Sequence, residues 1–237
     1  MVSAPRLALG PGVVRLILAL MVFVSHVSAW NIGTAAVVLF LMLSGYWVSR
    51  IYLQGSYDGV GQYLAGRVMR LWPLVIVAAL TALIFAPAFA AGIWMERSQW
   101  TPGRGPAMLS LAAFLAALAV YARLTPPDLE AAMALGVEHF SLATLLVAVL
   151  AIPFVAWNVH QPSGPRDRWL GDLSYPFYLL HFPLIWALTQ FLGDTPLMKI
   201  LALVVSLALT VAVNLWIDRP IEVWRRRRLQ TRRARAA

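Results

Sequence analysis

The chain has 237 residues, of which 61% are hydrophobic and only 12% are charged, and its formal net charge is +9. About a quarter of the residues of a soluble domain are charged, so this composition excludes an ordinary soluble protein. The apolar residues form blocks too long for core helices, and the short alternating segments of a β-barrel are absent. The sequence therefore predicts an all-α, polytopic transmembrane bundle. The absence of cysteine excludes disulfides and a thiol nucleophile.

Apolar blocks are expected at 13–30, 33–53, 69–93, 106–122, 139–157, 170–192 and 196–217. Short polar connections join them, which predicts one integral membrane domain over residues 1–237. Arginines flank the second connection, and a basic tail at 225–237 follows the last block. The positive-inside rule makes both cytoplasmic, together with the N-terminus.

Five apolar blocks lie between the second connection and the tail, and five crossings would place the tail outside. We therefore expect an even number of crossings, within a total of about six to eight membrane helices. The 106–122 block is the weakest because it is short and rich in alanine. The 128–157 stretch is where a broken or re-entrant helix is most expected.

The first block contains two ionisable side chains, Arg15 and His26. Eleven residues make three helical turns plus about 20°, so both lie on one helix face, roughly 16 Å apart. Ionisable residues inside a membrane usually face a cavity, which predicts a channel open to the cytoplasm. Two alternatives remain: a signal peptide, against which the position of Arg15 argues, and a snorkelling arginine with a structural histidine.

Two further groups of polar residues stand out. Arg67 and Arg70 lie one helical turn apart at the expected inner boundary, and Arg50 is near them in the sequence. Clustered arginines bind phosphate oxygens, although topological anchoring to anionic lipid would also explain them. Ser174, Tyr178 and His181 form a second polar stripe with spacing i, i+4, i+7. The alternative for His181 is a hydrogen bond between helices that serves packing.

One proline lies within this second stripe and another lies just after it. Pro176 is expected in the first turn of its helix, and Pro183 is expected to kink the helix just past the histidine.

Four motifs in order resemble the acyltransferase 3 family of membrane acyltransferases. They are R-x10-H at Arg15 and His26, "GTAAVVLFLMLSGYWVSRIY" at 33–52 with Ser44 and Gly45, "YLAGRVMRLWPL" at 63–74, and "LGDLSYPFYLLHFPLI" at 170–185. The chain looks like a shortened member. Its nearest match to the family's central segment is "ALGVEHFSL" at 134–142, which contains Glu138 but lacks the family's tryptophan and aromatic pair.

The resemblance implies a membrane O-acyltransferase that moves an acyl group, often acetyl, from acyl-coenzyme A to a hydroxyl of a cell-surface or exported saccharide. His26 would be the base or would carry the acyl group, and Arg15 would orient the donor. Arg67, Arg70 and Arg50 would bind the donor phosphates.

The expected partners are acyl-coenzyme A, a free or lipid-linked saccharide, and membrane lipids. The sequence is also compatible with a homo-oligomer. No metal is expected. No nucleic acid is expected either, because the position of the basic tail directly after a membrane helix is explained by membrane topology and by attraction to anionic lipid. The expected location is the bacterial inner membrane, with both termini cytoplasmic. A small transporter or polysaccharide-export subunit, or an inactive relative, is the alternative.

Overall fold

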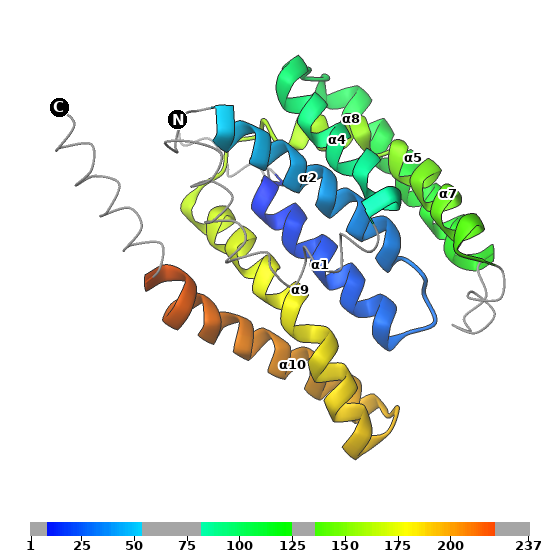
Figure 1. Cartoon of the computed structure of the whole chain (residues 1–237), viewed down its shortest axis with the longest axis vertical. Coiled ribbons are helices and arrows are strands. Elements are labelled where there is room, and N and C mark those ends of the chain that lie inside the picture. Colours follow the sequence, from blue (N-terminus) through cyan, green and yellow to red (C-terminus); the bar gives the residue numbers. More distant parts are fainter. Residues whose placement is uncertain (1–8, 54–81, 125–135, 221–237) are drawn as a thin grey trace, which may run out of the picture.

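A computed structural model describes residues 9–53, 82–124 and 136–220. These residues form helices and no strand, which confirms the all-α expectation (Figure 1). In chain order the helices are α1 (Pro11–Val27), α2 (Gly33–Leu53), α4 (Ala82–Ser98), α5 (Arg104–Leu124), α7 (Gly136–Val149), α8 (Ile152–Asn158), α9 (Pro165–Leu192) and α10 (Pro196–Val213), followed by a π-helical turn, η1 (Asn214–Asp218).

Three of the described helices are long and apolar enough to cross a membrane: 33–50 within α2, all of α5, and 196–218 in α10 with η1. The total of six to eight membrane helices stays a prediction. The expectation that 106–122 is the weakest block was wrong. Helix α5 runs over 21 residues, from Arg104 to Leu124, with a mean hydropathy of 1.9, because its alanines alternate with larger apolar residues between an arginine at each end.

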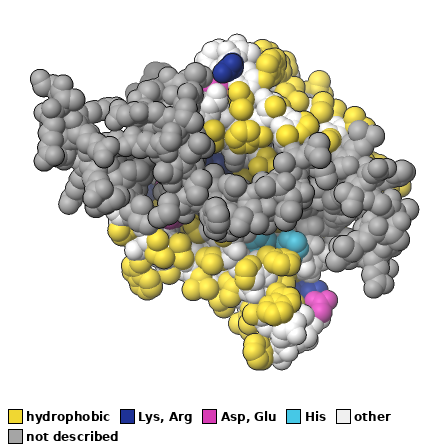
Figure 2. All heavy atoms as spheres, viewed as in Figure 1, with side chains coloured by type: hydrophobic (Ala, Val, Ile, Leu, Met, Phe, Trp, Pro, Cys, Tyr) yellow, Lys and Arg dark blue, Asp and Glu magenta, His cyan; other side chains and the backbone are white. Residues whose placement is uncertain are grey.

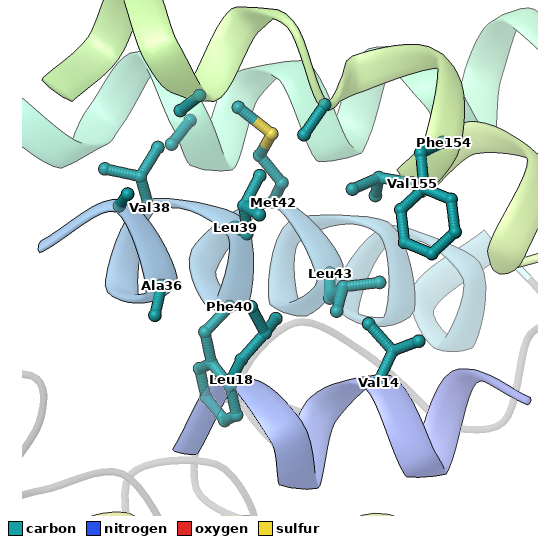
Figure 3. Close-up of a cluster of buried hydrophobic side chains, with 14 of the residues drawn as sticks. Val14, Leu18, Ala36, Val38, Leu39, Phe40, Met42, Leu43, Phe154 and Val155 are labelled. Atoms are coloured by element: carbon teal, nitrogen blue, oxygen red, sulfur yellow. The ribbon is translucent and has the colours of Figure 1, made fainter. Parts of the chain in front are cut away.

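Helix α2 lies at the centre of the bundle, with 61% of its spanning segment buried, compared with 22% for α5 and for α10. Val14 and Leu18 of α1 lie on one side of α2, and Phe154 and Val155 of α8 lie on the other (Figure 3). Most of the spanning segment of α2 is therefore covered by protein, whereas the outer faces of α5 and α10 carry exposed leucine, valine and isoleucine.

Two glycines allow helices α2 and α4 to pack with their backbones in close contact. A β-carbon at Gly45 would lie 2.2 Å from the carbonyl oxygen of Phe89, and one at Gly92 would lie 2.0 Å from that of Met42. Only a residue without a side chain lets two backbones approach so closely. Gly45, which the sequence singled out without a role, is therefore a packing residue of this crossing.

Two helix boundaries differ from expectation or refine it. Helix α9 begins at Pro165, so Pro176 lies inside the helix, and its expected place in the first turn was wrong. The polar stretch before residue 170 starts the helix early because Gly164 and Pro165 provide the N-terminal signal. The break expected within 128–157 is confirmed between α7 and α8, where Pro153 begins a new helix.

Helices α1 and α9 run in the same direction and begin side by side. The Asp167 carboxylate of α9 accepts hydrogen bonds from the backbone N–H groups of Gly12, at 3.1 Å, and Val13, at 2.8 Å. A carboxylate at a helix N-terminus satisfies N–H groups that have no partner in the helix and complements the helix dipole. Helix α10 then returns along α9, with Thr189 and Met198 in contact after the turn (Oγ1 to Sδ, 3.8 Å).

Candidate active site

The parallel arrangement of α1 and α9 brings His26 and His181 together, with their ring centroids 5.4 Å apart. His181 is 2% exposed, whereas the His26 side chain is exposed. Figure 2 shows histidine side chains in a small surface patch with apolar side chains along one side. The pair thus joins the buried interior to the molecular surface. The sequence predicted both histidines as candidates, but it treated them as members of separate stripes.

Three aromatic side chains pack around the His181 ring. Phe177 stacks on it at 5.7 Å, while Tyr178 and Phe23 lie at 5.8 and 6.3 Å between centroids. The His181 Nδ1 atom lies 3.0 Å from the Phe177 carbonyl oxygen, which can only accept a hydrogen bond. In the neutral ring the proton is therefore on Nδ1, and Nε2 carries a lone pair. Within the described residues, Nε2 is buried and has no hydrogen-bond partner. The His181 ring is therefore held in one orientation, with the lone pair of Nε2 free within the described residues.

The other members of the second polar stripe are also directed inward. Tyr178 stacks on Phe40 of α2, with 5.7 Å between ring centroids. Ser174 is buried and donates a hydrogen bond to the Gly171 carbonyl oxygen at 2.6 Å, so its hydroxyl is satisfied within its own helix. The structure therefore places Tyr178 and His181 at the candidate site and gives Ser174 a role in local packing.

Arg15 and Arg50 meet at the other end of α1. Their guanidinium carbons lie 5.8 and 5.5 Å from the centroid of the Trp47 indole. Arg50 also donates a hydrogen bond to the Tyr46 hydroxyl at 2.9 Å, and Tyr46 interacts with the buried Glu96 carboxylate. The attraction of each guanidinium group to the ring holds the two cations close together although they repel each other. We call Arg15 and Arg50 on the Trp47 ring the cationic site.

Arg15 and His26 both face α9, which confirms the prediction that they share one face of their helix. A β-carbon at Gly171 would lie 2.5 Å from Nη2 of Arg15, and His26 lies against His181. The negative charges of Asp172 and Asp167 act on the Arg15 guanidinium. One helix pair therefore carries the cationic site at one end and the histidine pair about 16 Å away along the axis.

Several residues of this arrangement were missed from the sequence. Trp47 and Tyr46 were passed over because they lie within an apolar block and look like packing residues. Asp167 precedes the recognised late motif and Gly171 lies within it, and only the contact with α1 gives each of them a role. The predicted donor residues Arg67 and Arg70 lie outside the described residues, as does the side chain of Glu138. Ser44 donates to the Phe40 carbonyl oxygen of its own helix at 2.8 Å.

Helical apolar architecture, a pair of histidines in contact and a cationic site define a membrane protein with the groups needed for acid–base chemistry. A family model described as an acyltransferase domain, that of the acyltransferase 3 family, matches residues 81–219. The match covers more than half of the chain, which therefore belongs to this family of acyltransferases. Its range includes His181 but not α1 or α2. Comparison with curated proteins and with solved structures gave no match.

Proposed function

We propose that this chain is a membrane O-acyltransferase that moves an acyl group, with acetyl the expected one, from acyl-coenzyme A to a saccharide hydroxyl. The contact between His26 and His181 carries the proposal. Acyl transfer to an alcohol needs a base, because a sugar hydroxyl is a poor nucleophile until it loses its proton. The family membership supports acyl transfer in general.

The two histidines have complementary surroundings. His181 is held by a backbone carbonyl and offers a lone pair at Nε2. His181 Nε2 can accept a hydrogen bond from the protonated ring nitrogen of His26, directly or through a water. The other ring nitrogen of His26 is then unprotonated and can act as a base. Because His26 is exposed, it can meet an acceptor hydroxyl. In this assignment His26 is the base, and His181 is the residue that orients it.

The proposed reaction balances without a further reactant. His26 takes the proton of the acceptor hydroxyl while the oxygen attacks the thioester carbonyl. The carbon–sulfur bond then breaks, and the coenzyme A thiolate takes the proton back from the imidazolium. Products are the O-acyl saccharide, free coenzyme A and neutral His26. Whether His26 itself carries the acyl group for part of the cycle is a separate variant of the same chemistry.

The cationic site fits the phosphate end of the donor. Arg15 and Arg50 present planar guanidinium groups, which bind phosphate oxygens in pairs. Arg67 and Arg70 are proposed to add to this site, and the arginine end of the bundle is proposed to face the cytoplasm, where acyl-coenzyme A is made. A bacterial inner-membrane location, cytoplasmic termini and a free or lipid-linked saccharide acceptor belong to the same proposal.

The test uses purified protein in detergent with acetyl-coenzyme A and a panel of saccharides, and it measures the release of free coenzyme A. His26→Ala should abolish transfer and leave donor affinity nearly unchanged, because a base acts on the transition state and not on remote phosphates. His160→Ala is the matched control, since its Nδ1 also lies against the carbonyl oxygen of the preceding turn, Ala156, at 2.7 Å.

The His160→Ala variant should transfer acyl groups, because its ring lies beside Tyr46 and not at the histidine pair. A folded His26→Ala protein that binds donor and reacts at the normal rate would rule out His26 as the base. In that event, loss of activity in His181→Ala would assign the base to the buried histidine.

A further inference from the structure

Three buried polar side chains on α10 and at the start of η1 have no use in the chemistry described so far. Ser206, Thr210 and Asn214 are 0, 1 and 2% exposed. Ser206 Oγ, Thr210 Oγ1 and Asn214 Oδ1 have no hydrogen-bond partner within the described part of the chain. Buried polar atoms are nearly always paired, because removing them from water without a partner is costly. Three in one row point to a polar ligand that fills the row when bound.

The row continues a face of α10 that is already packed against the helices of the site. Met198 and Ala202 precede it at the same four-residue spacing. They belong to one buried cluster with side chains from α1 and α9, namely Ala19, Phe23, Phe177 and Ile185. Residues four apart lie on one face of a helix, so Ser206, Thr210 and Asn214 are directed toward the same side as this cluster.

The depth of the row follows from the α9–α10 turn. Thr189 contacts Met198, and the two helices run in opposite directions from there. His181 lies eight residues before Thr189 on α9, and Ser206 lies eight residues after Met198 on α10. His181 and Ser206 are therefore at the same distance from the turn along the bundle axis. Asn214 lies eight residues further, about 12 Å toward the arginine end.

The backbone changes at the last member of the row. The α-helix ends at Val213, and a π-helical turn begins at Asn214. Such turns widen a helix locally and occur frequently at functional sites. In addition, the buried Nε2 of His181 is a further unpartnered polar atom at the other end of the row. The polar row therefore begins at the depth of His181 and ends at a local widening of α10.

We propose that Ser206, Thr210 and Asn214 bind the amide groups of the pantetheine arm of the donor. This inference rests on the proposed function, in which acyl-coenzyme A is the donor. The arm joins the phosphates to the thioester sulfur through thirteen bonds, which reach about 15 Å at the extension of a peptide chain. Arg15 and His26 are separated by about 16 Å along α1, so phosphates at the arginines place the thioester at the histidines.

The chemistry of the row matches that of the arm. Two amides lie between the phosphate and sulfur of pantetheine, each with one N–H donor and one carbonyl acceptor. The hydroxyls of Ser206 and Thr210 can donate to a carbonyl, and Asn214 Oδ1 can accept from an N–H. A bound arm would thus satisfy the atoms that have no partner in the free protein and hold the thioester in register with the histidines.

Thr210→Val tests this directly, because valine has the shape of threonine and lacks only the hydroxyl. The probes are acetyl-coenzyme A, acetyl-pantetheine, and phosphoadenosine diphosphate, the nucleotide half of coenzyme A. Loss of one hydrogen bond should weaken binding of the first two by about 3- to 10-fold. Binding of the nucleotide should not change. Ser206→Ala should behave in the same way.

Thr189→Val is the matched control, because its hydroxyl is already bonded to the Ile185 carbonyl oxygen at 2.8 Å. It should leave the affinity for acetyl-pantetheine unchanged. The thermal midpoint of Thr210→Val in detergent should equal or exceed that of the wild type, since the substitution removes an unpaired buried hydroxyl.

Normal binding of acetyl-pantetheine by both Thr210→Val and Ser206→Ala would overturn the inference while acetyl-coenzyme A remains the donor. A lowered thermal midpoint in both variants, with equal loss for all three probes, would assign the row to packing and would also overturn it. If the wild-type protein binds neither acetyl-coenzyme A nor acetyl-pantetheine, the proposed donor is wrong and the inference falls with it.

Discussion

Gly171 lies directly against Arg15: a β-carbon at position 171 would come within 2.5 Å of Nη2 of the guanidinium and 2.9 Å of the Gly12 Cα atom. The first neighbour is the end of a flexible side chain and can move, but the second is backbone. A side chain at position 171 would therefore both displace the arginine and push α1 away from α9.

We predict that Gly171→Ala lowers the stability of the protein by about 1–3 kcal/mol, the usual cost of overpacking a close contact. It should also raise the KM for acyl-coenzyme A, because Arg15 is displaced. Thermal unfolding in detergent and steady-state kinetics measure the two effects. Gly164→Ala is the control on the same chain segment, since a β-carbon there meets nothing within 4 Å. Equal behaviour of the two variants would contradict the close contact.

Trp47→Leu should weaken donor binding and leave the turnover of bound donor largely intact. The indole holds both guanidinium groups, and leucine keeps the apolar bulk without the attraction to a cation. Cation–π contacts contribute about 0.5–2 kcal/mol, which predicts a rise in KM of up to roughly 30-fold. Trp186→Leu, at an exposed position on α9, is the control. An unchanged KM in Trp47→Leu would remove the indole from the donor site.

The cap between α9 and α1 can be tested through Asp167. Asp167→Asn should destabilise the protein by about 0.5–2 kcal/mol, because its carboxylate accepts two hydrogen bonds from the first turn of α1 and complements the helix dipole. Ser163 also donates to this carboxylate, at 2.6 Å. The Asp167→Asn change should be visible as a lower thermal midpoint.

Asp194→Asn serves as the control for this prediction. Its ion pair with Lys199, at 3.0 Å, is largely exposed, and pairs of this kind add little to stability. We expect no measurable change in the thermal midpoint. A loss as large as that of Asp167→Asn would show that the cap has no special contribution.

Gly45→Ala and Gly92→Ala should each be strongly destabilising, because the added carbon would meet backbone of the opposite helix on both sides of the α2–α4 crossing. Relief would require the helices to separate, which opens the most buried part of the bundle. Gly105→Ala, in α5, has open space around the added carbon. It should raise stability by up to about 1 kcal/mol, the difference in helix propensity. Yield and thermal midpoint of the three variants check the prediction.

Much of the local structure could be predicted from the sequence, because long apolar blocks must be helical where water is absent. The ends of α2 and α10 and the break between α7 and α8 agree with this reasoning. The early start of α9 could not be predicted in the same way. Its first turn is polar, and the contact of Asp167 with the start of α1 stabilises it from outside the segment.

For the candidate site, too, one part could be predicted from the sequence and another could not. Spacing within one helix determines that Arg15 and His26 share a face, and it makes the polar row on α10 visible as i, i+4, i+8. Periodicity contains no information about the register between helices. That register depends on where glycines allow backbones to approach, as at Gly171, and on which side chains fit between them. Only the tertiary structure therefore decided that His26 meets His181 and that Arg15 and Arg50 share the ring of Trp47.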